Sequence, residues 1–330
     1  MLHEIFRAWH IVFASVGCVA NLLLGYVAVR KTPSATRSYA TLIINFAVTD
    51  FVESFLNLFL QMRLIAVPFN ATLIYVYHGF CQYTGSLSCR IGTSFFYHCF
   101  PHTAWSLLIS FSYRYYILNN TQLARRTLVI IVLVFYMPSL FQALIYWPSI
   151  VGREEILPYA EQLFPQYNLS QETAVIGGRL VTDFAFAFVI LHGCVPIFPI
   201  YICIFVLRTK IVNNLMRKAA LLSNEQKANH IQILKSLIPS LFLIGVVCYA
   251  CAQLGILSHP ILEYSMCATV IPMPMFSAVT YLSYVRPYRS FCLKLIGWER
   301  RTSVSVGGNQ SFVSSAHRKS IANYTVSGNS

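Results

Sequence analysis

The stretch His102-Thr-Ala-Trp-Ser-Leu-Leu-Ile-Ser-Phe-Ser-Tyr-Arg-Tyr-Tyr-Ile-Leu118 is largely apolar and aromatic, yet it contains Arg114 four residues from its end. An arginine inside a membrane-length apolar run is costly unless it reaches the surface or finds a partner, so it is a candidate for function. One interpretation is an anchor whose guanidinium extends to the interface beside the flanking tyrosines. The other is a switch residue at the cytoplasmic end of a membrane span.

The composition of the chain favours a membrane protein. Of the 330 residues, 56% are hydrophobic and 11% are charged, and the mean hydropathy is +0.59. This is too apolar for a soluble domain and is typical of helical membrane proteins. Basic residues outnumber acidic ones by 24 to 11. Because they lie in short loops between apolar runs, membrane orientation explains them better than a nucleic-acid partner does.

Seven apolar runs are long enough to cross a hydrocarbon core of about 30 Å. Backbone polar groups must be satisfied within each run in lipid, so all seven are expected to be helices. The runs are residues 11–29, 39–62, 91–118, 127–147, 181–207, 237–257 and 264–285. The sequence therefore predicts an all-α membrane protein, with a seven-transmembrane-helix bundle in residues 1–300 and a disordered cytoplasmic tail in residues 301–330.

The loops predict the orientation of the bundle. Basic residues dominate the loops after the first, third, fifth and seventh runs, whereas the opposite loops mix basic and acidic residues. The positive-inside rule then places the N-terminus outside and the C-terminus in the cytoplasm. Two glycosylation motifs, Asn70-Ala-Thr72 and Asn168-Leu-Ser170, lie in loops that this orientation puts outside, so we expect both asparagines to be glycosylated.

An intramembrane polar cluster is predicted around Asp50 in the second run. A carboxylate near the middle of the membrane must face the bundle interior and find partners. Asn21, Asn45 and Thr103 are available in neighbouring runs. The cluster either holds helices together through hydrogen bonds, or is sensitive to ions or protons and biases the helix arrangement.

Histidines and cysteines allow fewer sites than their number suggests. His98 and His102 share a helical face at the spacing of a two-histidine metal pair. His192 is the only plausible further donor, so interhelical hydrogen bonding is favoured and no metal is expected. Cys81 and Cys89 alone lie at or near the oxidising surface. Residues 147–179 contain no cysteine, which leaves either a local Cys81–Cys89 bridge or two free thiols.

Four motifs resemble those of a known family. They are Asn45-Phe-Ala-Val-Thr-Asp50, His78-Gly-Phe-Cys81, the stretch from His102 to Leu118, and Val285-Arg-Pro-Tyr-Arg-Ser-Phe291. Together they are similar to nematode seven-helix chemoreceptors, most closely serpentine receptor class delta, over residues 21–291. The resemblance implies a G-protein-coupled receptor (GPCR) of chemosensory neurons. It further implies a small environmental ligand and a place in the plasma membrane of the sensory cilium.

The chain departs from the rhodopsin-like pattern at several positions. Tyr113 stands where an acidic residue usually precedes the arginine of the third span, so an acid–arginine lock within that helix is missing. The sixth span has no Trp-x-Pro and the seventh no Asn-Pro-x-x-Tyr. Phe96 falls where amine receptors place an aspartate, which argues against a biogenic-amine ligand.

The favoured function is a receptor whose ligand binds between the outer halves of the third, fifth, sixth and seventh spans. Opening of the cytoplasmic face around Tyr113, Arg114 and Tyr115 would then admit a heterotrimeric G protein, with membrane lipids around the bundle. Asp183 would meet a cationic ligand group or, more simply, be a hydrated carboxylate at a helix N-terminus. The candidate pocket residues are Phe95, Phe96, Cys99, Asp183, His192, Tyr249, Gln253 and Tyr264.

Two other classes of membrane protein fit the sequence less well. A small-solute transporter or ligand-gated channel would favour inverted repeats, broken helices and rings of charge, none of which the sequence indicates. A membrane hydrolase would need paired intramembrane aspartates or a His/Asp metal set. Asp50 and Asp183 are expected at different depths, so we expect no enzyme and no cofactor.

Overall fold

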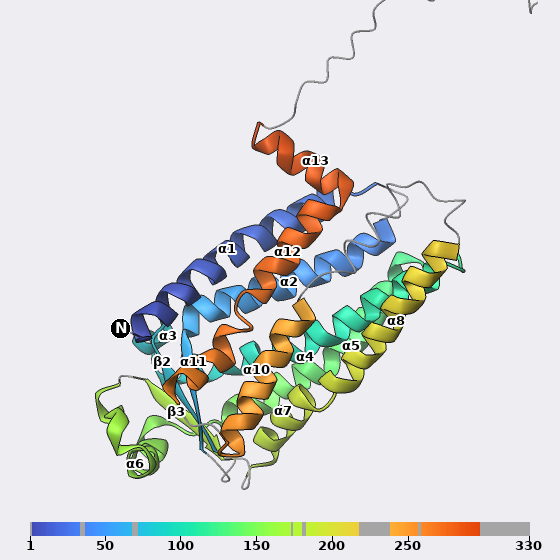
Figure 1. Cartoon of the computed structure of the whole chain (residues 1–330). Helices are drawn as coiled ribbons and strands as arrows, with labels where there is room; N and C mark the ends of the chain where they lie inside the picture. Colours follow the sequence, from blue (N-terminus) through green and yellow to red (C-terminus); the bar gives the residue numbers. More distant parts are fainter. Residues whose placement is uncertain are drawn as a thin grey trace, which may run out of the picture.

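The computed structural model describes residues 2–33, 37–67, 72–172, 174–179, 183–217, 238–256 and 259–297. In these ranges the chain forms an elongated bundle of helices, with a small sheet at one end and the short helix α13 at the other (Figure 1). Asn70, the tail 301–330 and most of the basic loop between the fifth and sixth spans lie outside the described residues.

Four long helices contain the first four predicted spans almost completely, although the first begins nine residues earlier than predicted. They are α1 (Leu2–Arg30), α2 (Arg37–Leu60), α4 (Ser86–Ile117) and α5 (Arg125–Ser149). The sixth span is α10 (Ile238–Gln253). By length and hydropathy alone, five described segments qualify as membrane spans: α1, α2, α5 and the helix pairs at 184–214 and 260–284. Together with α4 and α10, these five segments form the predicted seven-helix bundle.

The fifth and seventh spans are each divided into two helices, which corrects the expectation that the spans contain no broken helices. The fifth consists of α7 (Phe184–Cys194) and α8 (Ile197–Arg217), and the seventh of α11 (Pro260–Ala268) and α12 (Met273–Tyr284). Pro196 lies in the first break and Pro272 at the end of the second. Proline lacks the amide hydrogen and clashes with the preceding turn, so it interrupts a helix.

Side chains of α1 satisfy backbone groups beside the break in the seventh span. The Trp9 indole nitrogen donates to the Ala268 carbonyl at the end of α11 over 3.0 Å. The Asn21 amide donates to the Pro274 carbonyl in the first turn of α12, also over 3.0 Å. A broken helix is tolerated in a membrane where neighbours replace the lost hydrogen bonds. The polar residues of α1 therefore support this break.

A three-stranded antiparallel sheet, which the sequence analysis did not anticipate, covers one end of the bundle. Strands β1 (Met62–Val67) and β2 (Thr72–Tyr77) form a hairpin after α2, and β3 (Val175–Arg179), from the loop between α5 and α7, pairs with β2. Side chains alternate between the two faces. Leu64, Leu73 and Tyr75 belong to the core of the bundle, whereas Ile65 and Ile74 belong to a separate outer core.

Helix α6 (Arg153–Leu163) packs on the outer face of the sheet. We call the sheet and α6 together the cover. Ile156 of α6 approaches β3 so closely that a Cβ added at Gly177 would lie 2.6 Å from the Ile156 Cγ1. Glycine at this strand position therefore permits the close approach. Two 3₁₀ turns, Pro165–Tyr167 and Leu169–Gln171, lead from α6 back to β3.

The short helix α13 (Arg286–Leu295) follows α12 and turns away from it at the end of the bundle opposite the sheet (Figure 1). Its buried Tyr288 shares a hydrogen bond of 2.7 Å with the Thr32 hydroxyl, just beyond α1. This contact fixes the start of α13 against the end of α1.

Candidate functional site

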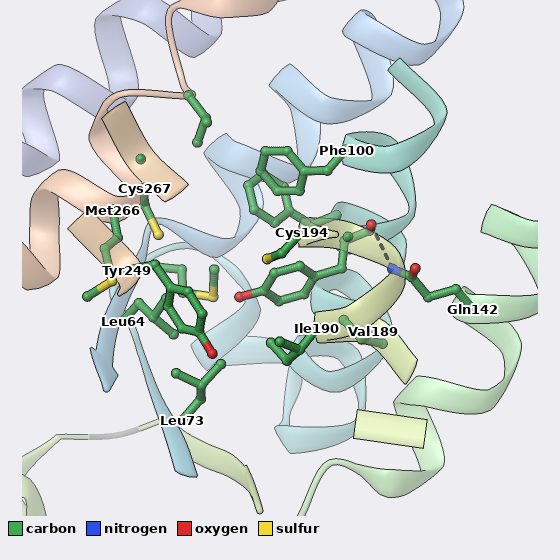
Figure 2. A pocket seen from close by; sticks show the side chains of 16 residues that line it. Leu64, Leu73, Phe100, Gln142, Val189, Ile190, Cys194, Tyr249, Met266 and Cys267 are labelled. Atoms are coloured by element: carbon green, nitrogen blue, oxygen red, sulfur yellow. Dashed lines mark hydrogen bonds between the residues drawn. The ribbon is translucent and has the colours of Figure 1, made fainter. Parts of the chain in front are cut away.

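An outer cavity of about 100 Å³ lies between the sheet and the helices (Figure 2). Helices α4, α5, α7, α10 and α11 and strands β1 and β2 contribute to its wall. Among the described residues its lining is apolar, aromatic and sulfur-rich, and no charged side chain takes part. The lining residues include Met62, Leu64, Leu73, Phe96, Tyr97, Phe100, Gln142, Gly193, Cys194, Tyr249, Met266 and Cys267.

Gln142 is a fixed polar group in this wall. Its Nε2 donates to the Tyr97 carbonyl over 2.9 Å, the bond drawn in Figure 2. Its Oε1 lies 2.5 Å from the His192 Nδ1. Both the nitrogen and the oxygen of the amide are therefore hydrogen-bonded. His192 does not line the cavity, but its hydrogen bond helps to fix the orientation of Gln142. Tyr249, Cys194 and Cys267 lie around the cavity in Figure 2 and add a hydroxyl and two thiols.

The structure places only some of the predicted pocket residues in this wall. Phe96 and Tyr249 line the cavity. Cys99 is buried in the adjoining core without lining it. Phe95 points instead to a surface groove between α2 and α4. Asp183 caps α7, since its Oδ1 accepts from the Ala185 and Phe186 amides over 2.7 and 3.2 Å.

The other two candidates lie nearer the end of the bundle. Gln253 is at the last position of α10, and its Nε2 is buried without a hydrogen-bond partner among the described residues. The Tyr264 ring stacks on Phe6 with the ring centroids 4.6 Å apart. Sequence reasoning missed Gln142 and the three sheet residues in the wall. The β-branched and aromatic runs at 62–67 and 72–77, too short to span a membrane, were the available signal.

An ion pair fastens the cover to the seventh span. The Arg63 guanidinium of β1 donates through Nε and Nη2 to the Glu263 Oε2 of α11, over 2.9 and 2.6 Å. The Tyr167 hydroxyl donates to the other Glu263 oxygen over 2.7 Å, and the guanidinium lies over the Tyr167 ring. Burial, followed by the bond to Glu263, raises the pKa of Tyr167 to about 12. We call these three residues the latch.

Two buried tyrosines of β2 tie the cover to the helices from below. The Tyr75 hydroxyl bonds the Tyr146 hydroxyl of α5, and the Tyr77 hydroxyl bonds the Thr93 hydroxyl of α4, each over 2.6 Å. All four groups are buried. Because a buried hydroxyl without a partner is costly, these pairs fix the sheet in one position over the cavity.

A second, inner cavity of about 60 Å³ lies deeper in the bundle. Asp50 and Glu53 of α2, both less than 4% exposed, line it together with Arg114 of α4. No ion pair joins these groups to each other within the described ranges. Phe100 lines both the outer and the inner cavity, so one aromatic ring lies between the two spaces.

The predicted polar cluster is divided between three places. Asp50 and Thr103 line the inner cavity. Asn45 instead donates to the Ser106 hydroxyl over 2.8 Å and contacts the His102 Nε2 at 3.1 Å, while Asn21 bonds the seventh span as described above.

The paired histidines of α4 make interhelical contacts. The rings of His98 and His102 lie parallel, and Tyr136 of α5 meets both edge-on with centroids 4.7 and 4.8 Å away. The described residues hold no cluster of three His, Cys, Asp or Glu side chains with metal-binding geometry. His98 and His102 therefore contact the aromatic ring of Tyr136, and His102 also contacts the Asn45 amide.

Arg114 is 6% exposed and lies in the last turn of α4. Its Nε donates to the Tyr39 hydroxyl over 2.8 Å, and its Nη2 donates to the same oxygen. The neighbouring Tyr113 is also buried and stacks on the Tyr39 ring. Tyr115 lies under Lys210 of α8. A tyrosine at the start of α2 therefore holds the arginine, where the sequence offered no acidic neighbour.

Cys81 and Cys89 are joined by a disulfide bond between α3 (Cys81–Thr84) and the first turns of α4. Both are fully buried below the sheet. Asn168 is exposed in the turn between the two 3₁₀ segments, where its backbone is left-handed with φ of 46°. An asparagine tolerates this conformation better than most residues.

Comparison with known sequences assigns most of the chain to one family model, described as serpentine type 7TM GPCR chemoreceptor Srd, which matches residues 6–294. Serpentine receptor class delta-19 of Caenorhabditis elegans is 51% identical over 297 residues, covering 88% of each chain. Serpentine receptor class delta-18 of the same species is 52% identical over 290 residues, covering 86% of each.

Comparison with solved structures supports the architecture. Squid rhodopsin superposes with a TM-score of 0.61 at 15% identity, covering 90% of this chain and 86% of its own. At this identity the likeness concerns the fold alone. It confirms the seven-helix bundle.

Proposed function

This chain belongs to the Srd family of serpentine seven-transmembrane chemoreceptors, and on that premise we propose that it binds a small uncharged molecule in the outer cavity and activates a heterotrimeric G protein. It is a multi-pass membrane receptor of the GPCR type rather than an enzyme. The observation that carries the proposal is the apolar cavity between five spans and the sheet, which shares Phe100 with the space around Arg114.

The lining of the outer cavity supports a small uncharged ligand. A charged group transferred into an apolar cavity without a partner is strongly disfavoured, and none of the described lining residues is charged. A dry protein cavity of roughly 150 Å³ lined by leucine, isoleucine and phenylalanine binds benzene. The outer cavity, at about 100 Å³, suits a molecule of similar size, for which Tyr249 offers a hydroxyl.

Phe100 is the proposed link between ligand and cytoplasmic face. It contributes to both cavities and packs edge-on against Phe96 with centroids 4.8 Å apart. The next residue, Pro101, lies inside α4 and weakens the helix where a hinge would act. A ligand that displaces Phe100 would rearrange the inner cavity, with Asp50 and Asn21 setting the balance between two states.

At the other end of the bundle, the contact between Arg114 and Tyr39 is proposed to stabilise the inactive state. Release of the guanidinium would let Tyr113, Arg114 and Tyr115 meet the G protein, together with the basic loop after α8. The excess of basic residues on this side supports a cytoplasmic location. With family membership, this favours a receptor in the plasma membrane of sensory cilia.

The breaks in the fifth and seventh spans favour a second candidate, a small-solute transporter. Discontinuous helices near the middle of the membrane are common in transporters, where they form the substrate site. Purified protein in liposomes separates the two functions. A receptor accelerates guanine-nucleotide exchange on an added G protein without solute flux, whereas a transporter gives flux that does not depend on the G protein.

A glycine in the wall permits a direct test of the ligand site. A Cβ added at Gly193 would meet nothing within 4 Å, and the same holds for Gly152 outside the cavity. Gly193→Leu should therefore reduce the free volume without disturbing the fold. We expect it to weaken an agonist found by screening at least about tenfold, while Gly152→Leu leaves potency unchanged. Equal potency in both variants would place the ligand elsewhere.

A further inference from the structure

A third, very small cavity lies at the sheet end of the bundle, beside the start of α1. Its free volume is about 10 Å³, close to the smallest space that holds one water molecule. Its histidine, arginine and glutamine side chains come from three parts of the chain, and Phe6, Met62 of β1 and Tyr264 of α11 complete the wall. Helix α1 contributes His3, Arg7 and His10, the junction of α2 and β1 contributes Gln61, and the residue after β2 contributes His78.

Three buried polar atoms on this cavity have no hydrogen-bond partner among the described residues. They are the His10 Nδ1, the Gln61 Oε1 and the His78 Nε2. A buried polar atom is nearly always satisfied by protein, water or an ion. Each orphan comes from a different element, yet all three belong to residues around one space of atomic size. Three unpartnered atoms on residues that line one small space are the pattern expected where a bound species completes their hydrogen bonds or coordination.

The second nitrogen of each imidazole faces an acceptor. The His78 Nδ1 lies 3.7 Å from a Glu172 carboxylate oxygen, and the His10 ring is turned toward the Asn57 carbonyl. Metal-ligating histidines are oriented in this way, with the other nitrogen directed at a carboxylate or a backbone carbonyl. Gln61 has a left-handed backbone with φ of 42°, a conformation that non-glycine residues adopt mainly where the surroundings impose it.

The electrostatic surroundings are compatible with neutral imidazoles and a cation. The two histidines lie in or at the edge of the buried interior, and a neutral imidazole is the form that binds metal. Positive neighbours also oppose a cation. Arg63 is paired with Glu263, Arg7 is exposed and screened by solvent, and Glu172 supplies a negative charge.

We propose that this cavity binds one divalent transition-metal ion through the His10 Nδ1, the His78 Nε2 and the Gln61 Oε1. Two imidazoles and an amide oxygen suit zinc or copper. His3, whose ring centroid is 4.1 Å from that of His78, lies at the rim of the site. The ion would join α1 to both ends of the β1–β2 hairpin and so stabilise the cover of the outer cavity. A single water is the competing occupant.

Zinc binding by the full-length receptor tests the site. Purified wild-type protein in lipid nanodiscs should bind one Zn²⁺ and gain thermal stability, whereas Mg²⁺, which prefers oxygen ligands, should have no effect. His10→Gln and His78→Gln should each weaken binding at least about tenfold, and Glu172→Gln, which orients His78, about tenfold. His259→Gln is the matched control, since His259 is an exposed histidine near the same end, and it should bind like the wild type.

Two results would overturn the proposal. One is the absence of a zinc-dependent stability gain in the wild type, which leaves a water in the cavity. The other is equal binding by the wild type and the His78→Gln variant, which means that zinc binds elsewhere. If the histidine variants do not fold, X-ray absorption on the zinc-loaded wild type decides the question. Two imidazole nitrogens in the first shell support the site, and a shell without imidazole contradicts it.

Discussion

Arg114 of α4 is hydrogen-bonded to Tyr39 of α2. The tyrosine hydroxyl oxygen accepts from both Nε and Nη2 of the guanidinium. The guanidinium carbon also lies 5.1 Å from the centre of the Tyr39 ring. A hydroxyl is a weaker acceptor for arginine than a carboxylate, because only one partner is charged. The contact can therefore hold the resting bundle while allowing easy release.

Tyr39→Phe should raise ligand-independent signalling. The substitution keeps the ring and removes the acceptor, and a hydrogen bond to a charged group contributes about 1.5–3 kcal/mol. A resting state weakened by that amount becomes about tenfold or more less populated relative to the active state. Basal nucleotide exchange per surface receptor is the measurement. Tyr116→Phe, which removes an exposed hydroxyl at the same end of α4, serves as the control, and equal basal rates would contradict the prediction.

The helical architecture could be predicted from the sequence because each span must be long, apolar and internally hydrogen-bonded. The two breaks could not, because prolines occur in several spans and only some interrupt a helix. Pro101 lies within α4, whereas Pro272 lies at the break in the seventh span. The difference depends on partners such as Trp9 and Asn21, which supply hydrogen bonds beside the broken seventh span. Such partners lie over 250 residues away in sequence.

Removing the charge of the latch should loosen the cover. Glu263→Gln leaves Arg63 largely buried without a counter-ion, which typically costs about 3 kcal/mol or more. We expect a lower unfolding temperature and faster dissociation of agonist. Glu154→Gln, an exposed position on α6, should change neither. The Arg63→Gln/Glu263→Gln double variant should be less destabilised than the sum of the single variants. Additive effects would show that the pair does not act as a unit.

The disulfide between Cys81 and Cys89 should form in the secretory pathway. Closing a loop of this length stabilises a fold by about 2–3 kcal/mol in the chain-entropy account, so Cys81→Ser should lower the unfolding temperature. Alkylation of the intact protein without reductant, followed by mass spectrometry, should leave both residues unmodified. Cys292, a free cysteine in α13 beyond the seventh span, provides the positive control for alkylation. Modification of Cys81 and Cys89 would rule out the bridge.

Glycosylation tests the orientation. If the sheet end is outside, a glycosidase should shift the mobility of the wild type, and Asn168→Gln with Asn70→Gln should abolish the shift. Asn168 is exposed in a turn, as an acceptor must be. A shift that survives both substitutions would mean that another Asn-x-Ser/Thr motif, such as Asn309-Gln-Ser311 in the tail predicted to be cytoplasmic, faces outside.

The ligand site could be predicted from the sequence only in part. Phe96 and Tyr249 lie on spans whose inward faces follow from helical spacing, and both line the cavity. Asp183 and His192 also suggested ligand contacts by their chemistry, but one caps a helix and the other holds Gln142. The positions of the sheet residues Leu64 and Leu73 could not be predicted. They depend on the pairing of β1 with β2 and of β2 with β3, which comes from a distant loop.

Guanine-nucleotide exchange on a purified heterotrimeric G protein, measured per surface receptor in Arg114 variants, tests the proposed mechanism most directly. We expect Arg114→Ala to abolish exchange while agonist affinity stays within about tenfold, roughly 1.4 kcal/mol. Arg114→Lys should recover exchange only in part, since lysine keeps the charge without the planar set of donors. Normal exchange in Arg114→Ala would contradict the account, and Arg114 would then be a membrane anchor rather than the switch.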